Sequence, residues 1–122
     1  MKQYITSQNF EQISFDYGKK KVHLKAIKYL ESVYGNYTVV NLNDKQQILS
    51  SFTLKYYSSQ LQNHESFFVV RKGLMINILF LSKIESREDG HYAILKDGSS
   101  FRMSRRKGKE LMLHLEKQNS LF

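Results

Sequence analysis

The sequence predicts a mainly β fold of about ten short, mostly antiparallel strands in small sheets, with one short central helix and a C-terminal helix. Apolar and polar residues alternate in many short segments, which is typical of strands with one buried face. Turn-forming residues, chiefly Gly, Asn and Asp, separate these segments. Only two stretches carry apolar residues at helical spacing. The 122 residues include no proline, so we expect no proline-rich linker, an N-terminal extension at 1–12 and one domain at 13–122.

In the first half of the chain, each pair of alternating segments is separated by a clear turn signal. The turns are Gly18-Lys19, Tyr34-Gly35-Asn36 and Asn43-Asp44-Lys45. Short turns between alternating segments favour β-hairpins. The segments expected to be strands are 13–17, 21–25, 27–32, 37–41 and 47–52.

The second half of the chain begins with a short helix and returns to strands. Thr53 is a suitable N-cap for a helix in which Leu54, Tyr57 and Leu61 share one face. Strongly apolar runs follow and are interrupted by Asn77. The segments expected here are strands at 67–70, 74–76, 78–84 and 99–103, with a hairpin at 85–95 whose tip is 88–91.

The stretch 97–109 has an unusual charge distribution. Asp97-Gly98 predicts a turn, the following strand has Phe101 and Met103 on its core-facing side, and Ser104 is a good N-cap for the final helix. Three cations then occupy the first turn of that helix, where the helix dipole favours acids, and 102–109 contains no acid. An anion such as a DNA phosphate would meet all three charges there, although a solvated basic helix end is the alternative.

Net charge points to a polyanionic partner. The formal net charge is +8 and the sequence pI is about 9.7, which favours nucleic acid first and an anionic membrane surface second. The chain contains no cysteine, so disulfides and thiolate chemistry are excluded. No apolar run approaches the roughly 20 residues of a spanning helix, and the N-terminus lacks a signal-peptide core. We therefore expect a cytoplasmic protein with no membrane partner.

Neither the histidines nor the acidic residues form a convincing metal or catalytic motif. No two histidines lie at ligand spacing, so zinc is not expected. Glu85, Glu88, Asp89 and His91 resemble a divalent-metal site of a nuclease, but Asp-Gly at 89–90 favours an ordinary hairpin turn. We expect neither enzyme activity nor a cofactor. The histidines are His23, His64, His91 and His114.

Three segments in order resemble the LytTR family of bacterial DNA-binding domains, which usually form the output half of response regulators. Residues 27–38 contain IKYLES and GNYT, similar to the family's I-x-Y-I-E-x…G-N-Y. Residues 67–77, FFVVRKGLMIN, track F-x-R-V-H-R-S-Y-L-V-N. Residues 95–106, LKDGSSFRMSRR, match L-x-D-G-x-x-(I/L)-x-(V/I)-S-R-R. The resemblance covers residues 13–117.

The resemblance implies an elongated β fold of three small sheets whose loops enter successive major grooves of duplex DNA. It implies base or groove contacts by Asn36 or Tyr37, by Lys72 and by Arg105. At 71–73 the chain has Arg-Lys-Gly where the family has His-Arg-Ser, so Gly73 lacks the family's hydroxyl. The implied phosphate contacts are Arg71, Arg102, Arg106 and Lys107.

We therefore predict a sequence-specific double-stranded DNA-binding transcription regulator without catalytic activity. The alternatives are a β-rich single-stranded nucleic-acid binder that stacks bases on Tyr and Phe, and a basic module that binds an acidic protein. Family members commonly bind paired repeats, which implies a homodimer on DNA. We expect no receiver domain before residue 13, so the chain is free-standing or a fragment of a longer regulator. A fragment would have a two-component signalling partner.

Overall fold

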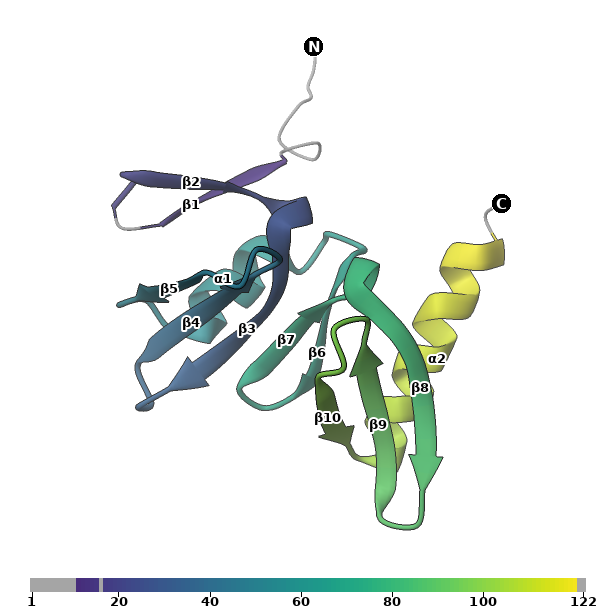
Figure 1. Cartoon of the computed structure of the whole chain (residues 1–122). Coiled ribbons are helices and arrows are strands. Elements are labelled where there is room, and N and C mark those ends of the chain that lie inside the picture. The colour runs from purple at the N-terminus through teal and green to yellow at the C-terminus, as the bar shows by residue number, and fades with distance from the viewer. Residues whose placement is uncertain (1–10, 16, 121–122) are drawn as a thin grey trace.

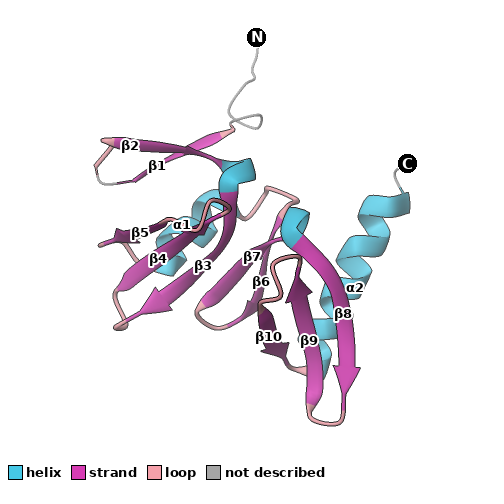
Figure 2. Ribbon diagram, viewed as in Figure 1, coloured by secondary structure: helices cyan, strands magenta, loops and turns pink. Residues whose placement is uncertain are grey.

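The computed structural model describes residues 11–15 and 17–120. Of the expected extension at 1–12, residues 1–10 lie outside this part, so the domain boundary stays a prediction. The described residues form ten strands and two α-helices (Figures 1 and 2). The strands are β1 (Gln12–Phe15), β2 (Lys20–His23), β3 (Ile27–Val33), β4 (Tyr37–Leu42), β5 (Gln47–Ser50), β6 (Phe67–Arg71), β7 (Leu74–Asn77), β8 (Leu81–Arg87), β9 (Gly90–Leu95) and β10 (Ser100–Met103). The helices are α1 (Leu54–Leu61) and α2 (Arg105–Ser120).

The strands form three sheets, and every pairing is antiparallel. β1 and β2 form a two-stranded sheet, the central sheet has the order β5-β4-β3-β7-β6, and the third sheet has the order β10-β9-β8. In Figure 1 the central sheet lies between the β1–β2 hairpin and the third sheet. The predicted mainly β fold with small antiparallel sheets is confirmed.

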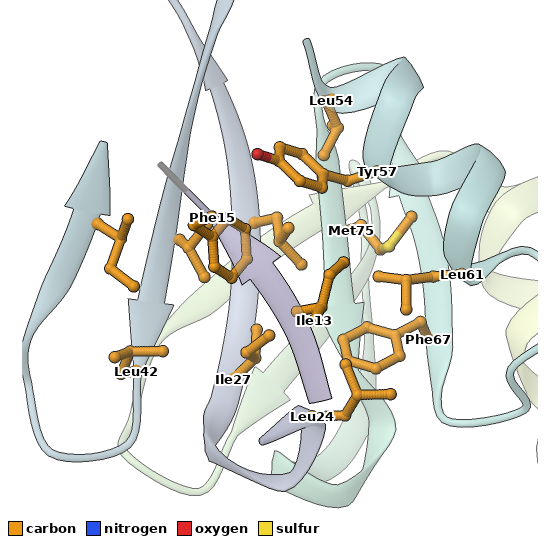
Figure 3. Close-up of a cluster of buried hydrophobic side chains, with 13 residues drawn as sticks. Ile13, Phe15, Leu24, Ile27, Leu42, Leu54, Tyr57, Leu61, Phe67 and Met75 are labelled. Atoms are coloured by element: carbon orange, nitrogen blue, oxygen red, sulfur yellow. The ribbon is translucent and has the colours of Figure 1, made fainter. Parts of the chain in front are cut away.

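The first hydrophobic cluster lies between the central sheet, β1 and α1. Figure 3 shows Phe15 of β1 and Tyr57 of α1 among its side chains, and their ring centroids are 5.2 Å apart. Helix α1 forms where predicted, because the Thr53 hydroxyl accepts the Tyr56 N–H at 3.2 Å and the face with Leu61 is buried.

The second cluster covers the opposite face of the central sheet. Successive residues of β7 serve both clusters, since Met75 packs into the first and Ile76 into the second. Leu111 of α2 and Met103 of β10 are buried in the second cluster. Phe101 packs edge-on against Tyr29 of β3 at 4.9 Å between ring centroids, as expected for a core-facing residue. Two buried faces explain the nearly continuous apolar sequence of β6 and β7.

Of the strand expected at 13–17, Asp16 lies outside the described residues and Tyr17 lies in a turn, and the strand expected at 47–52 ends at Ser50. Two other predicted strands are replaced in part by 3-10 helices. The strand expected at 78–84 starts as a 3-10 helix, Ile78–Phe80, because the Asn77 side chain accepts the Leu79 N–H at 3.0 Å. The strand expected at 21–25 ends at His23, and a second 3-10 helix, Leu24–Ala26, follows. The same Asn77 amide donates to the carbonyls of Leu24 and Ile27 at 3.1 and 2.9 Å. The buried Asn77 therefore connects the two 3-10 helices by hydrogen bonds.

Candidate nucleic-acid interface

The β3–β4 turn presents the first pair of candidate residues. Tyr34 and Gly35 have φ angles of 53° and 79°, so the chain reverses in the left-handed region before β4 begins. Asn36 and Tyr37 are exposed just after this reversal. Tyr34, whose side chain is 88% exposed, lies at the tip. The turn thus projects amide and phenol groups away from the core.

The β6–β7 turn presents the second pair. Gly73 has a φ of 85°, a conformation that suits glycine and strains other residues. The glycine at this position therefore adopts the turn conformation without strain. Lys72 is exposed in the turn, whereas the exposed Arg71 donates from Nη1 to the carbonyl of Arg102 at 3.3 Å. Arg71 therefore also joins the central sheet to β10.

The start of α2 carries the cations as the sequence predicts. The Ser104 hydroxyl accepts the Lys107 N–H at 3.0 Å, which confirms Ser104 as the N-cap. Arg105 is the first helical residue, and its Nη2 donates to the carbonyl of Glu88 at 2.8 Å. The first turn of the helix contains no acid.

The charges of that first turn are partly compensated from the second turn. Glu110 directly follows the stretch 97–109. Its carboxylate oxygens lie 3.9 Å from Arg106 Nε and 3.5 Å from Lys107 Nζ. The Lys107 ammonium also lies 5.4 Å from the centre of the Phe68 ring. The Arg106 side chain is 87% exposed and the Lys107 side chain 30%. Arg106 is thus the more available of the two cations.

Arg102 lies against the tip of the β8–β9 hairpin. Its Nε is 3.4 Å from Asp89 Oδ2, and its Nη2 donates to the Asp89 carbonyl. The hydrogen bond from the Tyr92 hydroxyl, together with the neighbouring cations Arg102 and Arg87, lowers the pKa of Asp89. The Asp89 carboxylate therefore stays charged beside the arginine.

These segments are spread along one edge of the molecule. In Figure 1 the β3–β4 turn, the β6–β7 turn, the β8–β9 tip and the start of α2 all lie at the lower edge. Gly35 and Lys72 line one groove between the first two turns. The Arg71–Arg102 bond joins the second turn to β10, and the Arg105–Glu88 bond joins α2 to the hairpin tip.

Lys55 is a further cation of this edge that the sequence pattern did not indicate. It follows the cap of α1 and lines the same groove as Lys72. Within the described part of the chain, no hydrogen bond or ion pair joins either ammonium to another side chain. The Thr53 cap would have placed Lys55 in the first turn of α1, but only the folded chain brings it beside the β6–β7 turn.

The acidic hairpin forms a turn, as the sequence analysis favoured. Glu85 is paired with Arg87 Nε at 2.6 Å, which holds the pKa of Glu85 below its ordinary value. His91 is buried and shares a hydrogen bond of 2.9 Å with Ser86. In the ranges that the structure describes, no three His, Asp or Glu side chains cluster as metal ligands, and no helix has the length and apolar character to cross a membrane.

Comparisons with known proteins agree with the family resemblance. The family model described as the LytTr DNA-binding domain matches residues 17–116. A solved LytTr DNA-binding domain of a methyl-accepting/DNA response regulator from Bacillus cereus shares 16% sequence identity with a TM-score of 0.67. The match covers 85% of this chain and 94% of that one, so the two share a fold. No curated protein matches the sequence.

Proposed function

Because the chain belongs to the LytTR family of DNA-binding domains, we propose that it is a transcription regulator that binds double-stranded DNA at a specific sequence. The observation that carries the proposal is the alignment of three separate candidate segments along one edge (Figure 1). An alignment of turns and a basic helix start suits a long, regular polyanion. The turns enter successive major grooves, where base edges can be distinguished.

Arg105 is the principal base-reading residue in this proposal. A guanidinium has five N–H donors, and one nitrogen of Arg105 is engaged by the Glu88 carbonyl. The remaining donors suffice for two parallel bonds to O6 and N7 of guanine, the commonest specific contact in DNA complexes. Lys72 reads the middle of the site, and Asn36 or Tyr37 the other end.

Phosphate contacts supply most of the affinity in this proposal. Cations that replace condensed counterions make the binding strongly dependent on salt. Lys55 joins this set because it shares a groove with Lys72. The proposed phosphate-binding residues are Lys55, Arg71, Arg102, Arg106 and Lys107.

The biological setting follows from the same family membership. We infer that the protein acts in the cytoplasm, without catalysis, and that two copies bind paired repeats. Where the chain is part of a longer regulator, a two-component signalling partner controls it. These inferences rest on the family and on the net charge of +8.

Exposed tyrosines support a second candidate, the binding of single-stranded nucleic acid. Tyr17 and Tyr34 are 77% and 88% exposed, and Tyr37 and Tyr56 are 41% and 44% exposed. Bases stack on such rings without regard to sequence. Competition separates the candidates, because a single-strand binder would release duplex when single strands are added.

A binding selection from randomised duplex DNA tests the proposed function. We expect enrichment of a short repeated motif, and wild-type protein should bind it far more tightly than scrambled duplex at moderate salt. Single strands of the same sequence should compete poorly. Absence of enrichment, together with salt-sensitive binding to every duplex, would contradict the proposal.

A further inference from the structure

The tip of the β8–β9 hairpin lies unusually close to the basic edge. Gly90, with a φ of 146°, opens β9, and a Cβ atom built on it would lie 2.8 Å from the Met103 carbonyl oxygen. No ordinary side chain fits that distance. The glycine therefore lets the hairpin tip approach the end of β10, directly before α2.

Two arginines of the basic edge contact the hairpin tip because it lies so close. Arg102 contacts both the carboxylate and the carbonyl of Asp89, and Arg105 donates to the carbonyl of Glu88. The tip thus holds one guanidinium from β10 and one from α2. The bonds span 13 and 17 residues of sequence, so they depend on the fold and not on local chain geometry.

The hairpin tip is itself braced by its own side chains. The Tyr92 hydroxyl donates to Asp89 Oδ2 at 2.8 Å, and the guanidinium carbon of Arg87 lies 4.0 Å from the centre of the Tyr92 ring. Glu85 in turn holds Arg87 through the 2.6 Å bond described above. The Asp89 carboxylate is therefore held in place by the hairpin itself, independently of Arg102.

An acid at this position opposes DNA binding unless it has another role, because like charges repel and Asp89 lies beside cations proposed to meet phosphates. A free arginine side chain loses rotamer freedom when it binds, which weakens recognition. A side chain already held in place loses less. Such an arrangement favours discrimination between sequences at the expense of general affinity.

We propose that the β8–β9 tip orients two DNA-contacting arginines, the base-reading Arg105 and the phosphate-binding Arg102, and that Asp89 is a positioning residue for Arg102 and, through the tip, for Arg105. The inference rests on the proposed function. The hairpin restricts where the two guanidiniums can lie. The duplex that binds best is therefore one whose guanine lies within reach of the restricted Arg105.

The test compares wild-type protein with Asp89→Ala on the selected duplex and on a scrambled duplex. Removal of the acid should tighten binding to the scrambled duplex, since one repulsive charge is lost. The affinity ratio between the two duplexes should nevertheless fall about three- to tenfold, the effect of releasing an ordered side chain. Partial unfolding would weaken binding to both duplexes, so it would not produce tighter binding to the scrambled duplex together with a lower affinity ratio.

Three further variants separate the effect of charge from the effect of the hydrogen bonds. Glu116→Ala removes one exposed acid from α2 at a distance from its first turn, and it should leave the affinity ratio unchanged. Asp89→Asn keeps an oxygen acceptor for Arg102 and Tyr92, so it should retain most of the discrimination. Tyr92→Phe removes only the hydroxyl that braces Asp89, and an intermediate loss of discrimination is expected even if Asp89→Ala folds poorly.

A measurement without DNA gives an independent readout. Nitrogen relaxation of the arginine Nε–H groups should show greater mobility of Arg102 and Arg105 in Asp89→Ala than in wild type. An unchanged affinity ratio in Asp89→Ala and Tyr92→Phe, while Arg105→Ala lowers that ratio, would overturn the positioning role and leave the function intact. Wild-type protein that discriminates between no duplexes would overturn both.

Discussion

Arg106 and Lys107 are adjacent in the first turn of α2, but the fold holds them differently. Arg106 is almost fully exposed and has one long contact to Glu110. Lys107 is half-buried, pairs with the same carboxylate and lies over Phe68. Exposed ion pairs contribute little to stability. We therefore expect Lys107 to contribute more to protein stability than Arg106, and the two residues to contribute equally to DNA affinity.

Replacement of either cation by alanine should weaken binding to all duplexes equally and reduce the salt slope by about one unit. Lys107→Ala should also lower stability by about 0.5–1 kcal/mol through loss of the cation–π contact, whereas Arg106→Ala should not. Anisotropy titrations at several salt concentrations and thermal melts check both statements. A loss of binding confined to one DNA sequence would show that these residues read bases.

In the sequence, Asn77 interrupts an apolar run and ends the motif at 67–77, but neither feature identifies its partners. In the fold it is buried and makes three hydrogen bonds, two of them to residues 50 and 53 positions away. Local patterns carry no information about such distant partners. The two 3-10 helices that it joins could not be predicted for the same reason.

Asn77→Ala should lower the free energy of unfolding by about 2–4 kcal/mol, because two carbonyls and one N–H lose a buried partner. Urea denaturation measures the change. Asn43→Ala, at an exposed turn position, is the matched control and should stay within about 0.5 kcal/mol of wild type. Equal stabilities of the two variants would contradict the structural role of Asn77.

Among the elements, the strands and both α-helices follow from local signals. Alternation, turn residues and the caps at Thr53 and Ser104 identify them because each signal lies within the element or next to it. The contacts between elements do not follow in this way. The motif at 95–106 indicates that Arg105 is important, but its contact with Glu88 requires the hairpin to fold back onto α2.

Helix α2 depends on a glycine at its contact with β9. A Cβ atom on Gly108 would lie 2.3 Å from Cδ2 of the buried His91. Gly108→Ala would ordinarily stabilise a helix by about 1 kcal/mol. Here it should destabilise the protein by about 1–3 kcal/mol, because the helix must move or His91 must repack. Chemical denaturation gives the value.

Two further variants establish the cause. In a His91→Ala background the cost of Gly108→Ala should shrink but not vanish, since the 2.3 and 2.6 Å contacts with the imidazole ring are removed and only the 2.8 Å contact with the Cβ of residue 91 remains. Lys109→Ala, at an exposed position of the same helix, should change stability by less than about 0.5 kcal/mol. Stabilisation by Gly108→Ala in the wild-type background would show that the contact is looser than described.

At the scale of the whole molecule, one ion pair joins the central sheet to the third sheet. Lys28 Nζ of β3 lies 2.5 Å from Asp97 Oδ2, in the turn between β9 and β10. That bond and the Ser99 N–H lower the pKa of Asp97 to about 2 from an ordinary value of 3.8. Because the pKa is lowered, Asp97 stays charged and the ion pair persists until the solution is strongly acidic.

The stabilisation from Asp97 is present above pH 3.8 and is lost as the pH falls through about 2. Wild-type protein should therefore lose about 1 kcal/mol more than Asp97→Asn between these pH values, a modest effect because the carboxylate is partly exposed to solvent. Asparagine keeps the turn and removes the charge. Identical acid-denaturation profiles of the two proteins would contradict the ion pair.

In the proposed function, one edge of this molecule reads duplex DNA through Arg105. The most direct test replaces each guanine of the selected site in turn by 7-deazaguanine, which lacks the N7 acceptor. For wild-type protein, one replacement should cost about 1–3 kcal/mol, and for Arg105→Ala the same replacement should cost nothing. An equal cost in both proteins, or no sensitive guanine at all, would contradict the account.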